Sequence, residues 1–126
     1  MAEQKTNPVN WFEIPTTELD RAKKFYEGVF GFPMTSEELG PMKLVFFPMV
    51  NDVYGSAGAL VKAEGYAPSA TGIVVYFSVE DIEATLKKAA AFGGKTLVPK
   101  MAIGEYGFVA HLADSEGNRI GLHSMN

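Results

Sequence analysis

The sequence repeats itself at half its length, and this repeat constrains the fold more than any other feature. When the 126-residue chain is shifted by 63 residues, half its length, apolar, acidic and glycine positions of one half fall on like positions of the other. The matched pairs are Ile14 with Phe77, Glu18 with Asp81, Leu19 with Ile82, Asp20 with Glu83, Lys24 with Lys87, Gly31 with Gly94, and Gly58 with Gly121. Such a period is too long for a solenoid repeat and too short for two independent domains. We therefore expect two similar modules that share one core and enclose a space between them.

A cycle of strand, helix and three strands occurs in each half. Thr17 offers a cap oxygen to the first helix, and Gly31 provides the left-handed residue that ends it. The predicted strands span residues 9–14, 32–37, 42–49 and 54–61, then 73–79, 95–99, 106–112 and 119–124, with the second helix from about 80 to 92. The sequence thus predicts one α+β domain over residues 1–126, with module 1 at about 8–62, a linker at about 62–71 and module 2 at about 72–125.

The stretch Ile73–Phe77 is apolar at every position, which is typical of a strand covered on both faces. We expect a helix on one side of it and more protein or a closed space on the other. Because strand, helix and three strands follow one another in each module, the first strand must pair across the sheet rather than with its sequence neighbour. A curved sheet around an interior space satisfies both conditions.

Charge and cysteine content narrow the range of partners. The formal net charge is −4 and no basic stripe is present to neutralise phosphates, which argues against nucleic acid and anionic membranes. The absence of cysteine excludes disulfides, thiolate metal ligands and a thiol nucleophile. The first ten residues lack the apolar segment of a signal peptide, and no apolar run reaches membrane-spanning length. We therefore expect a cytoplasmic protein whose partner is a small organic molecule or another protein.

Two segments resemble the signatures of one superfamily. The run FEIPTTELDRAKKFYEGVFGF resembles the opening signature of the vicinal oxygen chelate superfamily, which includes lactoylglutathione lyase (glyoxalase), bleomycin-resistance proteins and extradiol dioxygenases. The run DSEGNRIGLHS resembles its last hairpin. The resemblance covers about residues 9–124 and implies a fold of two βαβββ modules whose curved mixed sheets enclose a cleft. It also implies a homodimer.

Metal-dependent members of this superfamily hold a divalent cation in the cleft through His, Glu or Gln side chains. When their signatures are laid on this chain, the ligand positions fall on Trp11, Val74 and Gly121, and the internal repeat adds Gly58. Divalent cations need oxygen or imidazole donors that converge on one point, and none of these four residues provides one. The resemblance therefore implies the fold without the usual metal ligands, and we expect no cofactor.

Strand alternation indicates which side chains share a face with those four positions. Residues two steps away point the same way, which places Glu13, Leu60, Tyr76 and His123 on the inward face. Glu13 and His123 are the candidate catalytic residues, as a general acid and base pair. The alternatives are a structural ion pair or a solvated rim position for Glu13, and simple exposure near the C-terminus for His123.

Five further residues are candidates for ligand binding. Trp11 offers a face for stacking on a flat ligand, and Tyr76 offers a hydrogen bond to a ligand oxygen. Tyr54 and Tyr106 lie in segments that precede strands at the predicted cleft mouth, and His111 lies on a strand face that the pattern does not fix. The alternatives are core packing for Trp11 and Tyr76, and plain surface or packing positions for the other three.

These observations favour a glyoxalase-like protein that binds a small organic molecule without a metal, either as a binding protein or as a metal-independent enzyme. One alternative is a lactoylglutathione-lyase-like lyase or isomerase with displaced ligands, in which Glu13, His123 and His111 hold a divalent metal. Another is a sequestering protein of the bleomycin-resistance kind, which binds a drug and leaves it unchanged.

Overall fold

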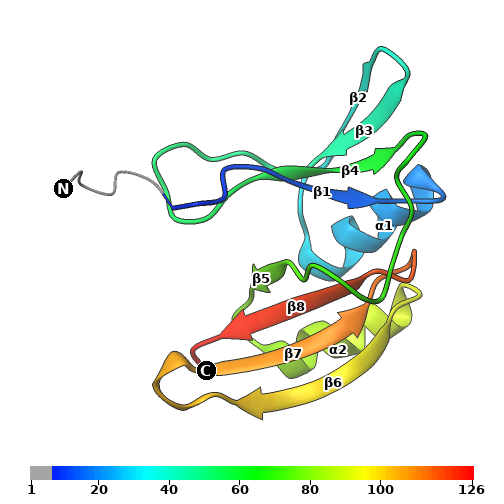
Figure 1. Cartoon of the computed structure of the whole chain (residues 1–126). Coiled ribbons are helices and arrows are strands. Elements are labelled where there is room, and N and C mark those ends of the chain that lie inside the picture. Colours follow the sequence, from blue (N-terminus) through cyan, green and yellow to red (C-terminus); the bar gives the residue numbers. More distant parts are fainter. Residues whose placement is uncertain (1–6) are drawn as a thin grey trace.

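The two predicted modules are present, and each contains one helix and four strands. The computed structural model describes residues 7–126 (Figure 1). Module 1 consists of β1 (Phe12–Pro15), α1 (Leu19–Phe30), β2 (Thr35–Leu39), β3 (Met42–Phe46) and β4 (Gly58–Lys62). Module 2 consists of β5 (Tyr76–Ser78), α2 (Ile82–Ala91), β6 (Lys95–Ala102), the short 3-10 helix η1 (Gly104–Tyr106), β7 (Phe108–Ala113) and β8 (Arg119–Ser124). The α+β fold class predicted from the sequence is confirmed.

Each module forms a four-stranded mixed sheet. The strand order is β1-β4-β3-β2 in one sheet and β5-β8-β7-β6 in the other. The first strand of each module pairs in parallel with the last, and the remaining pairs are antiparallel. The prediction that the first strand pairs across the sheet is therefore confirmed, and β1 and β5 are left as edge strands.

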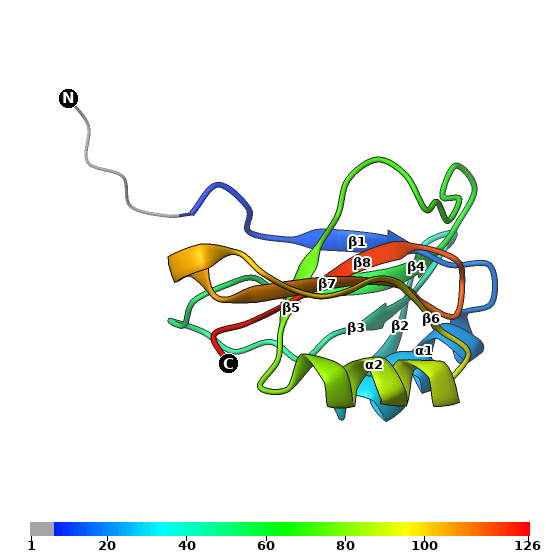
Figure 2. The same cartoon turned by 90° about the horizontal axis from the view of Figure 1, so that it is seen from below.

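Both helices lie on the same side of the two sheets, and the linker between β4 and β5 arches over the other side (Figure 2). The main core lies on the helical side and contains residues of both modules, among them Tyr26 and Phe25 of α1, Leu60 of β4 and Leu122 of β8. A smaller apolar cluster of Leu44, Ala59 and Val61 lies on the opposite face of the first sheet. One shared core thus joins the modules, as the repeat predicts.

Helix boundaries follow the local sequence signals at three of four ends. Gly31 caps α1 with a positive φ of 74° and donates its N–H to the Glu27 carbonyl, which ends the helix where predicted. Asp81 caps α2 by accepting a hydrogen bond from the Ala84 N–H. With 12 residues in α1 and 10 in α2, no helix within residues 7–126 is long and apolar enough to cross a membrane.

Several predicted strands differ in extent from the observed ones, and two of these differences affect residues at the candidate site. The predicted strand 73–79 is only three residues long, because its first part belongs to the linker, and Ile73 is 93% exposed rather than covered on both faces. Tyr76 is also half-exposed, since β5 lies at the edge of its sheet. The predicted strand 54–61 begins only at Gly58, because Asp52 and Gly55 adopt positive φ and turn the chain before it.

The register between first and last strands differs by one residue from the sequence repeat. Ile14 pairs with Leu60, and Phe77 pairs with Leu122. The first residues of these pairs are 77 − 14 = 63 apart, but their partners are 122 − 60 = 62 apart. Leu60 therefore lies in the shared core and not on the inward face where it was predicted, and Ala59 faces the open side instead.

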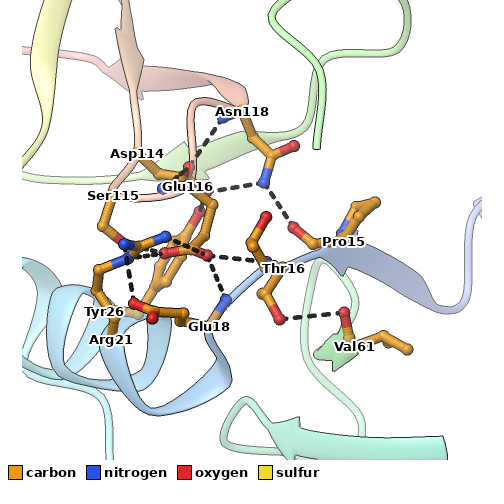
Figure 3. Close-up of polar contacts among 11 residues, drawn as sticks. Pro15, Thr16, Glu18, Arg21, Tyr26, Val61, Asp114, Ser115, Glu116 and Asn118 are labelled. Atoms are coloured by element: carbon orange, nitrogen blue, oxygen red, sulfur yellow. Dashed lines mark hydrogen bonds and ion pairs between the residues drawn. The ribbon is translucent and has the colours of Figure 1, made fainter. Parts of the chain in front are cut away.

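The start of α1 is capped by module 2. Thr17 was predicted to cap this helix, but the N-cap residue is Glu18, and its side chain makes no capping hydrogen bond. Instead, the Glu116 carboxylate in the β7–β8 turn accepts hydrogen bonds from the backbone N–H groups of Thr17 (2.9 Å) and Glu18 (2.8 Å) (Figure 3). The helix dipole favours a negative charge at this end. The cap thus comes from a residue almost one hundred positions away in sequence.

A polar network extends from this cap into the module junction (Figure 3). Arg21 forms an ion pair with Glu116 at 2.7 Å, and the Glu116 side chain is fully buried. Burial alone would raise the pKa of Glu116, but the hydrogen bonds from Arg21 and from the backbone of Glu18 and Thr17 outweigh it and lower the pKa to about 2. Asn118 donates to the Pro15 carbonyl at 2.8 Å. The network therefore fixes the orientation of module 2 on module 1.

Candidate ligand-binding site

An aromatic groove lies between the edge strands β1 and β5. Its volume is about 600 Å³, within the range of small-molecule sites. Six aromatic rings from both modules line it, and we call it the aromatic groove: Phe12, Phe32, Phe47, Tyr54, Tyr76 and Phe77. The rings of Phe12 and Phe77 meet edge to face at 5.9 Å, and Phe47 lies 5.7 Å from Phe77. The groove is therefore open to flat apolar molecules and built by both halves of the chain.

A second hollow of about 680 Å³ adjoins the aromatic groove. It is lined by Trp11 and by the segment 48–57, and residues 54–57 line both spaces. Trp11 and Tyr54, predicted as ligand-binding residues, thus face one hollow together. Trp11 also packs edge to face on Phe46 at 5.8 Å, so this residue both lines the hollow and packs against the first sheet.

The Tyr76 ring forms the module 2 wall of the aromatic groove and lies across Gly121 of β8. A Cβ atom on Gly121 would overlap Cγ, Cδ2 and Cε2 of this ring, so only glycine allows the tyrosine to lie there. Beyond Gly121, the Tyr76 hydroxyl reaches His111 of β7, at 2.6 Å from Nε2. The structure therefore joins two of the predicted ligand-binding residues, and the ring occupies the place of a side chain at one of the superfamily's metal-ligand positions.

Arg119 determines which nitrogen of His111 carries the proton. The Arg119 guanidinium lies 3.0 Å from Nδ1 of His111, and because a guanidinium only donates, Nδ1 is the acceptor. Burial, followed by the charge of Arg119, lowers the pKa of His111, so the ring is neutral near pH 7 and its hydrogen is on Nε2. Nε2 then donates to the Tyr76 oxygen. The phenol hydrogen of Tyr76 is consequently free to be donated to another acceptor.

The residues at the superfamily's metal positions do not fit a divalent cation. Trp11 and Val74 have no oxygen or imidazole donor, Gly121 is covered by an aromatic ring, and the register places Ala59 rather than Gly58 on the open face. Within residues 7–126, no three His, Cys, Asp or Glu side chains form a group that could hold a metal ion. The displaced-ligand alternative required such a group from Glu13, His111 and His123, and the structure does not bring the three together.

Glu13 and His123 lie in different sheets, and no hydrogen bond or ion pair among the described residues joins them. Glu13 accepts a hydrogen bond from the Tyr66 hydroxyl of the linker at 2.7 Å. His123 donates from Nε2 to the Tyr106 carbonyl at 2.6 Å. Tyr106 itself is 68% exposed in η1. The catalytic role of Glu13 and His123, and the ligand role of Tyr106, stay predictions.

Two residues near the site were missed in the sequence. The turn at 114–118 fixes the β7–β8 register, which places Arg119 and His111 on the same open face two rows apart. The residues of this turn indicate that register, so the position of Arg119 on the open face could have been predicted from the sequence. Tyr66 had none, because the linker has no periodicity that would place its side chain over Glu13.

Comparison with known proteins matches nearly the whole chain to one superfamily. The model of the Glyoxalase/Bleomycin resistance protein/Dioxygenase superfamily matches residues 9–122. A glyoxylase-like domain-containing protein of Didymella fabae is 30% identical over 101 residues, which cover 78% of this chain and 77% of that protein. A Mycobacterium bovis protein named as glyoxylase CFP32 is 26% identical over 99% of this chain, and the match spans 48% of its own length.

Solved structures of related proteins share the fold at low identity. A glyoxylase/bleomycin resistance protein/dioxygenase domain from Frankia sp. superposes with a TM-score of 0.73 at 13% identity, covering 95% of this chain and 98% of that domain. Glyoxalase I from Zea mays superposes with a TM-score of 0.67 at 18% identity over 94% of this chain and 46% of that protein. Since the family model covers nearly the whole sequence, the chain belongs to the glyoxalase/bleomycin resistance protein/dioxygenase superfamily.

Proposed function

We propose that this chain is a glyoxalase-like protein that binds a small, flat, apolar organic molecule in the aromatic groove, without a metal at the superfamily's ligand positions. The single observation that carries the proposal is a groove of about 600 Å³ lined by aromatic rings from both modules. Aromatic rings prefer stacked or edge-to-face neighbours, so a flat ligand gains more there than a branched aliphatic one.

A second candidate function is metal-independent catalysis at the Tyr76 hydroxyl, which lies beyond Gly121 on the open face of the second sheet, next to the groove rather than in it. The observation that favours it is the chain Arg119–His111–Tyr76, which leaves the phenol hydrogen of Tyr76 free for donation. A group held in this way can donate a proton to an oxygen that gains negative charge during a reaction. Recovery of the ligand unchanged after prolonged incubation would favour the binding protein, including the drug-sequestering alternative, whereas a new product would favour the enzyme.

Residence in the cytoplasm and assembly as a homodimer are two further parts of the proposal. A homodimer is implied by the resemblance, and light scattering of the purified protein tests it directly. Neither point is needed for ligand binding in the groove.

The groove is tested with acetophenone as a flat aromatic probe and NMR of the backbone amides as the readout. We expect shifts of residues that line the groove, including Ala57 and Ser78, and loss of these shifts in Ser56→Phe, which fills the groove from an exposed position. Ser36→Phe, on exposed β2 and outside the groove, is the matched control. Shifts that persist in Ser56→Phe, or that appear only elsewhere, would contradict the proposal.

Metal content is tested on the same material. Protein without a histidine tag is dialysed and analysed for nickel, zinc, iron and manganese, and we expect less than stoichiometric metal. A stoichiometric ion that is lost together with acetophenone binding upon chelation would refute the metal-independent part of the proposal.

A further inference from the structure

A third cavity lies between β1, β8 and the linker, next to the aromatic groove, with which it shares Val75. The linker arches over this side of the sheets (Figure 2). The volume of this cavity is about 220 Å³, and we call it the seam pocket. Its polar lining residues are Glu13, Ser69, Thr71, Asn118 and Arg119. Its apolar walls come from both modules and the linker and include Ile14, Ile73, Val75 and Ile120.

Two opposite charges line the seam pocket without pairing with each other. Glu13 and Arg119 both face the cavity, yet the ion pairs among residues 7–126 are those of Arg21 with Glu18 and Glu116. A carboxylate and a guanidinium that line one pocket without pairing with each other can hold the two ends of a molecule that carries both charges.

Each charge retains bonding capacity toward the cavity. Tyr66 donates to Oε1 of Glu13, and Oε2 of that carboxylate has no partner within residues 7–126. Arg119 uses Nε for the Ala70 carbonyl at 3.0 Å and Nη1 for His111, and its Nη2 has no partner in the same range. One acceptor and one charged donor are thus available to a ligand.

Asn118, by contrast, has no amide hydrogen left for a ligand. Its side chain donates to the Pro15 carbonyl and to Asp114, and its amide oxygen accepts from the Ser69 N–H at 3.0 Å. Asn118 holds the linker in place over the pocket, and recognition falls to Glu13 and Arg119.

The size of the seam pocket limits the ligand to a small molecule. Its volume is about seven times the ~30 Å³ that one water molecule occupies in the liquid, and it lies below the usual range for drug-sized ligands. The aliphatic walls suit a short branched alkyl group. A molecule of this size with one cationic end, one anionic end and an alkyl body matches every lining feature.

We propose that the seam pocket binds a small zwitterion with an aliphatic body, of the class of an α-amino acid such as leucine. Its ammonium group binds Oε2 of Glu13, its carboxylate binds Nη2 of Arg119, and its alkyl group contacts the aliphatic wall. This site adjoins the aromatic groove at Val75, and it does not depend on the proposed function. It shares only Arg119 with the chain that holds Tyr76.

The experiment titrates the full chain with L-leucine, isocaproate and isoamylamine, and follows amide NMR shifts and calorimetric heat. Leucine has both charges, and the other two compounds retain the alkyl group with only the carboxylate or only the amine. We expect leucine to bind at least about tenfold more tightly than either, since each of the other two compounds lacks one charged group and its hydrogen bond. Equal binding of all three compounds would overturn the proposal.

Substitutions then assign each charge. We expect Glu13→Gln to weaken leucine binding about tenfold and to leave isocaproate binding unchanged, while the matched control Glu105→Gln, on exposed η1, changes neither. Arg119→Gln should weaken leucine and isocaproate alike, and Arg119→Lys retains part of the affinity. Tyr76→Phe should leave leucine binding intact, which separates this site from the aromatic groove. Leucine affinity that is unchanged in Glu13→Gln would overturn the assignment.

Discussion

The Tyr26 hydroxyl donates a hydrogen bond to the Asp114 carboxylate at 2.7 Å, in a fully buried contact between the two modules (Figure 3). Tyr26 belongs to the first of the two superfamily signatures in the sequence, and Asp114 begins the second. The two signatures are therefore contact partners: one supplies the helix and the other supplies the turn that holds the start of that helix. Their motif residues in this junction serve the fold, which explains why they identify the fold and say little about a reaction.

Tyr26→Phe should destabilise the protein by about 1–3 kcal/mol, because it removes one of the donors to a buried carboxylate. Asp114 keeps three hydrogen bonds, from Glu116 N, Asn118 N and Asn118 Nδ2, so the fold should survive. The measurement is the free energy of unfolding in urea. Tyr66→Phe removes a hydroxyl that bonds to an exposed carboxylate and is the control, with a smaller expected effect. Equal unfolding midpoints for wild type and Tyr26→Phe would contradict this interpretation.

Glu116 should make the stability of the protein depend on acid pH. Its pKa in the folded protein is about 2, below the ordinary value of 4.5, so its charge stabilises the fold above pH 4.5, and this stabilisation is lost as the pH falls through 2. This lowering of the Glu116 pKa corresponds to about 3 kcal/mol in the free energy of unfolding. Glu116→Gln should therefore be less stable than wild type at neutral pH, and the difference should shrink as the pH falls from 4.5 to 2. Urea unfolding over this range measures it, and Glu105→Gln should retain the wild-type profile.

Local signals in the sequence predicted the helices and the order of elements well. Gly31 ends α1 where predicted, because a left-handed residue without a side chain is needed at that point and the requirement is local. The start of the same helix was mispredicted, because its cap is Glu116, a residue distant in sequence. Contacts between distant segments depend on the assembled fold, and local pattern does not show them.

The sequence predicted only part of the candidate site, because strand register also depends on contacts between distant segments. Alternation along β1 and β5 correctly placed Tyr76 on the open face, but it placed Leu60 there too, because the repeat hides a one-residue difference in strand register. A one-residue slip moves every side chain of a strand to the other face. His111 had no predicted face from its own strand, and only the hairpin register places it beside Tyr76.

Arg119→Met should raise the pKa of His111 toward 6.5. Burial lowers this pKa first and the Arg119 charge adds to it, so removal of the charge recovers part of the shift. In wild type, folding favours the neutral His111 ring. Its contribution to the free energy of unfolding is fully present above pH 6.5 and is lost as the pH falls through the lowered pKa of His111. An NMR titration of the His111 ring protons measures the change. Tyr76→Phe removes the other partner and keeps the charge, so there the pKa should remain low. An unchanged pKa in Arg119→Met would contradict the role of Arg119.

Gly121→Ala should destabilise the protein by about 1–3 kcal/mol, because the added Cβ overlaps the Tyr76 ring. The double variant Gly121→Ala with Tyr76→Ala should recover most of this loss relative to Tyr76→Ala alone, since the overlapping ring is then absent. Urea unfolding of the four proteins forms a double-mutant cycle, and additive effects would show that the ring does not lie across the glycine. The same cycle bears on the metal question. Strong coupling would mean that a larger side chain at position 121, such as the Glu of a metal site, fits only if the Tyr76 ring moves away.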